Sequence, residues 1–181
     1  MPIRTPRLEL HLLSLPVIEA LLDGDHQRAD ALVSFPVSAD TFSGDDDVLT
    51  LRRDQLRADP TELAWLYRAV VLLETGEVVA RAGFHARPDV DGTVEIGYRV
   101  QQAHRCQGYA TELTAAMLAW ASRRGAARCL ASTSPSNLAS QAVLARLGFV
   151  RTGEQMDDID GLEWIFTRVL GDPLPGVPAH R

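Results

Sequence analysis

The chain has 181 residues, of which 46% are hydrophobic and 23% are charged, and its formal net charge is −6. This composition is typical of one globular domain with a sizeable core, and the acidic surplus argues against a nucleic-acid-binding protein. The two cysteines form no spaced pair, so we expect neither a disulfide framework nor a metal site. No apolar run approaches the ~18 residues of a membrane span, and no apolar leader opens the chain. We therefore expect a cytoplasmic protein without a membrane partner.

The first half of the chain predicts strands and helices from its hydrophobic periodicity. Leucine occupies every second position from Leu8 to Leu12, which is typical of a strand with one buried face. Pro16 is favourable at the start of a helix. The expected elements are a strand at 7–13, a short helix from Pro16 to Leu22, a loop at 34–47, a helix at 48–56, and a hairpin of strands at 65–73 and 78–85.

Two acidic segments have competing interpretations. Asp45, Asp46 and Asp47 precede the helix at 48–56, where carboxylates stabilise a helix N-terminus; alternatively, they line a mouth that attracts amines. The aspartate-rich turns at 89–92 and 157–161 faintly suggest calcium, but both lack the length and the distal glutamate of a calcium loop. We expect ordinary turn chemistry at both turns.

The central stretch at 94–121 joins a strand to a helix through a small turn. Apolar residues alternate with Glu95, Gly97 and Arg99, which predicts a strand at 93–100 with two different faces. A helix with apolar residues at helical spacing then extends to Ala121. The turn at 105–110 lies at its N-terminus, where unpaired N–H groups and the positive end of the helix dipole favour phosphate oxygens. The sequence therefore predicts an anion-binding turn here.

The remaining elements complete a mixed sheet. They are a strand at 127–133, a helix at 138–147, two antiparallel strands at 149–154 and 162–170, and a proline-rich tail at 171–181 that we expect to be mobile. The strands at 93–100 and 127–133, joined by the long helix, form a parallel βαβ unit. We predict the α+β class, with a single domain at 1–170.

The motifs resemble those of the GCN5-related N-acetyltransferase (GNAT) superfamily. Arg105-x-x-Gly108-x-Ala110 is similar to the turn Gln/Arg-x-x-Gly-x-Gly/Ala, which holds the pyrophosphate of acetyl-coenzyme A in that superfamily. Asn137-x-x-Ser140 and the later Leu-Gly-Phe at 147–149 resemble its Asn-x-x-Ser…Leu-Gly-Phe segment. Residues 5–10 are similar to the start of the RimJ/RimL-like branch, whose named members acetylate ribosomal-protein N-termini.

The resemblance covers about residues 5–170 and implies the GNAT fold. This fold has a mostly antiparallel, twisted sheet of about six or seven strands with one parallel βαβ unit and flanking helices. The resemblance also implies acetyl-coenzyme A as co-substrate, with no metal. Main-chain amides of the turn would grip its pyrophosphate, and the Val100 backbone and the Asn137 side chain would hold its pantetheine arm. The expected cofactor-binding residues are Val100, Arg105, Gln107, Gly108, Tyr109, Ala110, Thr111 and Asn137.

Glu95 and Ser140 are the candidate catalytic residues. A protonated amine must lose a proton before it attacks the thioester, and glutamate on this strand often takes that proton in the superfamily. A carboxyl group with a raised pKa would suit this task, whereas the alternative is a solvent-facing Glu95 paired with Arg99. Ser140 is the candidate donor to the departing thiolate because Leu144 stands where many members have tyrosine. A thiolate leaves well enough that a dedicated acid is dispensable in principle.

The favoured function is an acetyl-coenzyme A-dependent N-acetyltransferase, and the alternative is a non-catalytic acyl-coenzyme A-binding module. In the first case a primary amine, from a protein N-terminus or a small molecule, attacks the thioester directly. In the second the chain acts as a sensor or a subunit. Cys106 has no evident His–Asp partners and is not expected to be a nucleophile. His85 and His104 flank the site, and lone histidines are more often structural or solvent-facing. The sequence leaves the acceptor and a homodimer open.

Overall fold

The computed structural model describes residues 1–157 and 161–171. Its elements in chain order are β1 (Ile3–Arg4), β2 (Leu8–Leu12), α1 (Leu15–Leu22), α2 (His26–Ala31), α3 (Asp46–Ala58), the 3₁₀ helix η1 (Pro60–Ala64), β3 (Arg68–Leu72), β4 (Val78–Phe84), β5 (Thr93–Val100), the 3₁₀ helix η2 (Gln102–His104), α4 (Tyr109–Ser122), β6 (Arg128–Thr133), α5 (Leu138–Arg146), β7 (Val150–Asp157) and β8 (Gly161–Val169). Residues 172–181 of the expected tail, and 158–160 of the second aspartate-rich turn, lie outside the described residues. No helix in the described ranges has the length and apolarity to cross a bilayer.

The strands form one mixed sheet in the order β1-β2-β3-β4-β5-β6-β8-β7. Strands β5 and β6 are parallel and are joined by α4, and every other neighbouring pair is antiparallel. This topology confirms the predicted α+β class and its single parallel βαβ unit. Within the described residues the sheet has eight strands, whereas the expected number was six or seven. The strand that was not predicted is β1, which has two residues and is too short to produce a readable periodicity.

Local differences from the predicted elements have physical causes. The unpredicted α2 buries one side chain, Ala29, and is capped by Asp25, which accepts from the Arg28 amide. Strand β3 begins at Arg68 rather than residue 65, and Trp65 instead caps the C-terminus of η1. Short elements with little buried surface leave a weak hydrophobic pattern in the sequence.

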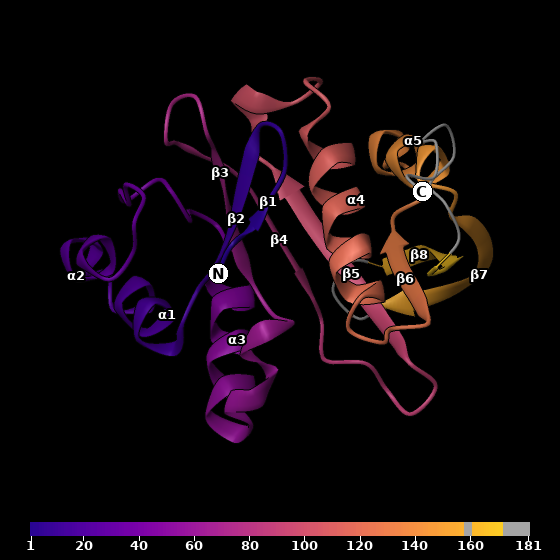
Figure 1. The fold of residues 1–181 in the computed structure, drawn as a ribbon, viewed down its shortest axis with the longest axis horizontal. Coiled ribbons are helices and arrows are strands. Elements are labelled where there is room, and N and C mark those ends of the chain that lie inside the picture. Colours follow the sequence, from indigo (N-terminus) through magenta and orange to yellow (C-terminus); the bar gives the residue numbers. More distant parts are fainter. Residues whose placement is uncertain (158–160, 172–181) are drawn as a thin grey trace.

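Apolar clusters cover the two faces of the sheet. Leu113 and Met117 of α4 pack in one cluster with alternate residues of β5, including Val94, while α1 and α3 contribute to a second cluster with residues such as Ala69 of β3. Figure 1 shows α4 beside β5 at the centre of the molecule, with α1–α3 on one side of this pair and β6–β8 on the other. Residues Val94 and Ile96 therefore face α4, and Glu95, Gly97 and Arg99 face the opposite side of the sheet.

The sheet opens between its two parallel strands. Pairing of β5 with β6 ends, within the described chain, at Glu95 opposite Leu130. Beyond that point β5 stays paired with β4 as far as Val100, and β6 stays paired with β8 as far as Thr133. The edge of β5 from Ile96 to Val100 is therefore available to a ligand that enters between the strands.

Candidate active site

The turn before α4 presents free backbone amides. Cys106 and Gly108 both have positive φ angles, 61° and 82°, and alternating backbone conformations of this kind turn successive N–H groups towards one side. Within the described chain, none of the amides from Cys106 to Thr111 donates a hydrogen bond. A Cβ on Gly108 would meet nothing nearer than the Arg7 guanidinium at 3.5 Å, so glycine is favoured here by the left-handed backbone rather than by crowding. The turn has the features of an anion-binding site.

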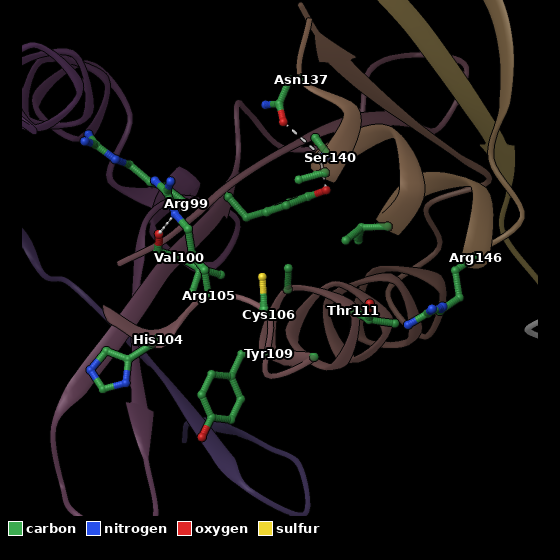
Figure 2. Close-up of a pocket in the computed structure, with 15 residues that line it drawn as sticks. Arg99, Val100, His104, Arg105, Cys106, Tyr109, Thr111, Asn137, Ser140 and Arg146 are labelled. Carbon is green, nitrogen blue, oxygen red and sulfur yellow. Dashed lines mark hydrogen bonds between the residues drawn. The ribbon is translucent and has the colours of Figure 1, made fainter. Parts of the chain in front are cut away.

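A cavity of about 630 Å³ adjoins this turn, between the end of β5, the start of α4 and α5. It is lined by most of the residues that the sequence suggested for cofactor binding, together with the candidate acid: Val100, Arg105, Gly108, Tyr109, Ala110, Thr111, Asn137 and Ser140. Figure 2 shows Val100, Thr111 and Ser140 around the hollow, with the Tyr109 ring turned away from it. That ring is buried beneath the guanidinium of Arg7, 4.6 Å from its centroid, so Tyr109 offers its backbone to the cavity.

Gln107 and Glu95 are not among the residues that line this cavity. The Gln107 carbonyl accepts a hydrogen bond from Arg7 at 3.0 Å, which fixes the back of the turn. Glu95 lies on the other face of the sheet, as its place in the alternating pattern of β5 requires. The candidate site therefore has two parts, the cavity on the α4 face of the sheet and Glu95 on the opposite face, and the opening between β5 and β6 connects them.

The cavity wall also contains His104 and Cys106, which the sequence placed beside the site and in the turn. Sequence reasoning missed five further lining residues: Tyr98, Arg99, Ala139, Val143 and Arg146. Arg146, the last residue of α5, reaches towards Thr111 in Figure 2. Its position relative to Ala139 and Val143 follows helical spacing, which was the signal that could have revealed it. With Arg105 it gives this acidic protein a locally cationic wall, which complements a phosphorylated ligand.

Two hydroxyl groups meet on the α4 side of the opening. The phenol of Tyr98 lies 3.0 Å from the Ser140 hydroxyl, and burial raises the pKa of Tyr98 while this hydrogen bond opposes the increase. Asn137 caps α5 by accepting from the Ser140 amide at 3.1 Å, as its residue type predicted. Leu144 is fully buried in the core and offers no hydroxyl. The hydroxyl pair therefore comes from β5 and the first turn of α5.

A carboxylate and an imidazole meet on the opposite face. Glu95 accepts a hydrogen bond from Ser132 at 2.8 Å, and its other oxygen lies 3.4 Å from Nδ1 of His85. The interaction with His85 is the main cause that lowers the pKa of Glu95, with a smaller contribution from Ser132, and burial opposes them. The expectation of a raised pKa was therefore wrong. The alternative pairing with Arg99 was also wrong, because Arg99 lies 3.6 Å from Asp45 instead.

Asp45 belongs to a buried charge cluster rather than to an open mouth. It is 4% exposed, accepts a hydrogen bond from the Tyr67 phenol at 2.7 Å and forms an ion pair with buried Arg81. Helix α3 begins at Asp46, two residues earlier than predicted, so Asp46 and Asp47 lie in its first turn rather than before it, and the Asp45 side chain makes no capping hydrogen bond. In the turn at 89–92, Asp89 accepts from the amides of Asp91 and Thr93, which is turn chemistry.

The mixed sheet, its opening between parallel strands and the amide-rich turn beside that opening define a GNAT-type acyltransferase. The chain belongs to the GNAT acetyltransferase family, because the family model of the acetyltransferase (GNAT) domain matches residues 18–150. It is an acetyltransferase of this family.

The similarity to known proteins covers most of the chain. The uncharacterized N-acetyltransferase YjdG of Bacillus subtilis (strain 168) is 29% identical over 153 residues, which cover 82% of this chain and 89% of YjdG. A GNAT-family acetyltransferase from Bacillus anthracis superposes with a TM-score of 0.62 and 20% identity, covering 93% of this chain and 98% of the other. The ribosomal α-N-protein acetyltransferase RimL, solved in complex with coenzyme A, gives a TM-score of 0.65 at 16% identity, with 94% and 98% covered.

Proposed function

We propose that the protein transfers the acetyl group of acetyl-coenzyme A to a primary amine by direct attack of the amine on the thioester. The observation that carries this proposal is the position of the β5–β6 opening. On one side of the sheet are the phosphate-binding turn and the Tyr98–Ser140 hydroxyl pair, and on the other is the Glu95–His85 pair. A thioester held in the opening would have a donor group on one side and a proton acceptor on the other.

The first task of the protein is to hold the donor. The free amides between Cys106 and Thr111, with Arg105 and Arg146, fit the phosphates of coenzyme A by charge and by hydrogen-bonding capacity. The open edge of β5 and the amide group of Asn137 fit the pantetheine arm. Orienting two reactants in this way can remove ~7–11 kcal/mol from the barrier of a bimolecular step.

The second task is to move protons. The Glu95–His85 pair takes a proton from the ammonium form of the acceptor, and the resulting amine attacks the thioester carbonyl. Ser140 then donates a hydrogen bond to the departing sulfur, supported by Tyr98. The sequence of events requires no covalent enzyme intermediate, in agreement with an exposed Cys106 that no acid–base pair accompanies in the described part of the chain.

The acceptor is a primary amine from a protein N-terminus or a small molecule. The RimL relative, named as an α-N-protein acetyltransferase, supports the first of these. A non-catalytic acyl-coenzyme A-binding module is the competing function, since the binding turn alone would serve it.

Thiol release separates the two functions. The protein is incubated with acetyl-coenzyme A and a panel of peptides with free N-termini, amino acids and polyamines, and free thiol is followed together with the mass of each acceptor. We expect thiol release that depends on at least one acceptor and one acetyl group on that acceptor. Tight coenzyme A binding in calorimetry, with no thiol release on any amine, would instead identify a binding module.

A further inference from the structure

We propose that Nε2 of His85 accepts the proton of the acceptor amine, and that Glu95 is a positioning residue that orients the imidazole. This inference rests on the proposed acetyl transfer and assigns its proton acceptor. It reverses the roles that residue type alone suggests, in which the glutamate is the base. The assignment follows from how the backbone and ring of His85 are held.

The backbone of His85 is fixed from two elements. Its amide donates to the Glu95 carbonyl at 2.8 Å, which extends the β4–β5 ladder by one residue. Its carbonyl accepts from Arg52 at 2.9 Å and from Gln55 at 2.8 Å, both on α3. His85 is therefore anchored between β5 and α3, although it follows the last residue of β4.

The ring of His85 lies over Gly97. A Cβ built on Gly97 would be 3.2 Å from Nε2 of His85, so a larger residue at this position would displace the ring. The pairing between β5 and β6 ends at Glu95, and Gly97 lies two residues beyond it on the open part of β5. Nε2 is thus placed beside the opening, on the face opposite the hydroxyl pair, and the side chain remains 51% exposed to an incoming acceptor.

The carboxylate selects which ring nitrogen carries the proton. One oxygen of Glu95 accepts from Ser132, and the other faces Nδ1 of His85. A carboxylate favours a proton on the ring nitrogen that faces it, which leaves the lone pair on the other nitrogen, here Nε2. Among the described residues, Glu95 is the charged group paired with the ring of His85, and Arg52 contacts its backbone carbonyl.

The chemistry of the two side chains agrees with this division. The lowered pKa of Glu95 makes it a weak base at neutral pH, where a proton acceptor works best with a pKa near the working pH. Imidazole is the side chain that commonly exchanges its proton between pH 5 and 8. An ionised carboxylate at Nδ1 also stabilises the imidazolium that forms when Nε2 takes a proton.

The proton balance is complete without another reactant. The ammonium group of the acceptor transfers one proton to Nε2, which later releases it to water. The nitrogen lone pair forms the bond to the thioester carbonyl carbon, the carbon–sulfur bond breaks, and its electron pair goes to sulfur. The second proton lost from nitrogen ends on the sulfur, so the products are an amide, a free thiol and one released proton.

Rate profiles of matched variants test the assignment. With a working acceptor, His85→Gln should lower kcat by about 10²-fold or more and remove the acidic limb of the profile of kcat/KM against pH, with little change in acetyl-coenzyme A affinity. Glu95→Gln should lower kcat less and move the acidic limb to lower pH, because the imidazolium loses its negative neighbour. Imidazole in the buffer should partly restore His85→Ala. His26→Gln, on α2, is the control for the loss of a histidine elsewhere.

An unchanged rate in His85→Gln, together with a lost acidic limb in Glu95→Gln, would overturn the proposal and make Glu95 the base. The ring tautomer gives a readout that does not depend on turnover. Nitrogen-15 chemical shifts of His85 in the wild-type protein should report a proton on Nδ1 above the titration range, whereas a proton on Nε2 would overturn the proposal. Absence of thiol release with every amine in the wild-type protein would refute acetyl transfer and the role of His85 with it, whereas wild-type release that is unchanged in His85→Gln would overturn the His85 assignment alone.

Discussion

At the scale of single residues, the Tyr98–Ser140 hydroxyl pair is the proposed substitute for the tyrosine that Leu144 replaces. Leu144 of α5, which stands where many superfamily members have tyrosine, is buried in the core, so α5 supplies no phenol from this position. The phenol comes instead from β5 and reaches Ser140 across the cavity, 3.0 Å from its hydroxyl oxygen. Burial raises the pKa of Tyr98, which keeps the phenol neutral and able to donate. In the proposed reaction, we therefore expect Tyr98 to orient the Ser140 hydroxyl towards the departing sulfur.

Ser140→Ala should lower kcat by about 10- to 100-fold, because a hydrogen bond to a charged partner contributes ~1.5–3 kcal/mol. Tyr98→Phe should lower kcat by a smaller factor, since it removes the orientation and not the donor. The double variant should be no slower than Ser140→Ala if Tyr98 acts through Ser140. Steady-state kinetics of the three variants check this expectation. Independent, multiplying effects would mean that Tyr98 contacts the reacting atoms itself.

At the scale of elements, the junction of η2 and α4 combines a bent backbone with a helix start. Positive φ angles at Cys106 and Gly108 turn the chain so that the free amides face the cavity. Arg7, far away in sequence, supports the turn from behind by donating to the Gln107 carbonyl and pairing with Glu112 of α4. The turn is therefore prearranged for an anion by contacts on its far side.

Gly108→Val should weaken coenzyme A binding by at least about tenfold, because a left-handed backbone costs a residue with a Cβ ~1–2 kcal/mol and the turn would rearrange to avoid it. Gly125→Ala is the matched control. Gly125 follows the other end of α4 with a φ of 87° and has nothing within 4 Å of its Cβ position. The control should lose unfolding free energy of the same order and keep its affinity. Calorimetry with coenzyme A checks both variants, and wild-type affinity in Gly108→Val would refute the turn assignment.

The sequence predicted those elements that bury a periodic face. Strand β5, helix α4 and the strands that follow them along the chain were predicted because apolar residues such as Leu113 and Met117 repeat at the spacing of the element. The amide-lined turn was predictable for the same reason, since Gly108 immediately precedes a well-defined helix. Strand β1 and helix α2 were missed because each contributes little buried surface.

The partners of site residues were harder to predict than the residues themselves. Ser132 reaches Glu95 across the parallel pair β5–β6, and His85 reaches it across the antiparallel pair β4–β5. Both contacts depend on strand register, and a shift of one residue would place each side chain on the other face. The loop at 85–92 carries no motif that fixes this register. The lowered pKa of Glu95 could therefore not be deduced from sequence.

At the scale of the whole molecule, Asp45 connects the helical layer formed by α1–α3 to the sheet. It precedes α3 and contacts Tyr67 before β3, Arg81 on β4 and Arg99 on β5. Burial raises the pKa of Asp45, and Tyr67 and the two arginines oppose that increase. Arg81 is itself 4% exposed, and its guanidinium forms an ion pair with this carboxylate. The free energy of unfolding should therefore be sensitive to replacing the Asp45 carboxylate with a neutral amide.

Asp45→Asn should lower the free energy of unfolding by ~3–5 kcal/mol, the usual cost of leaving a buried charge without its partner. This is a large part of the ~5–15 kcal/mol that stabilises a typical domain. Asp46→Asn, at an exposed position in the first turn of α3, removes the same charge and should cost no more than ~1 kcal/mol. If the unpaired Arg81 causes the loss, adding Arg81→Met to Asp45→Asn should recover part of it, because replacing a whole buried pair is often tolerated. Urea unfolding of the four proteins measures these differences, and equal losses in the two aspartate variants would mean that the cluster does not stabilise the fold.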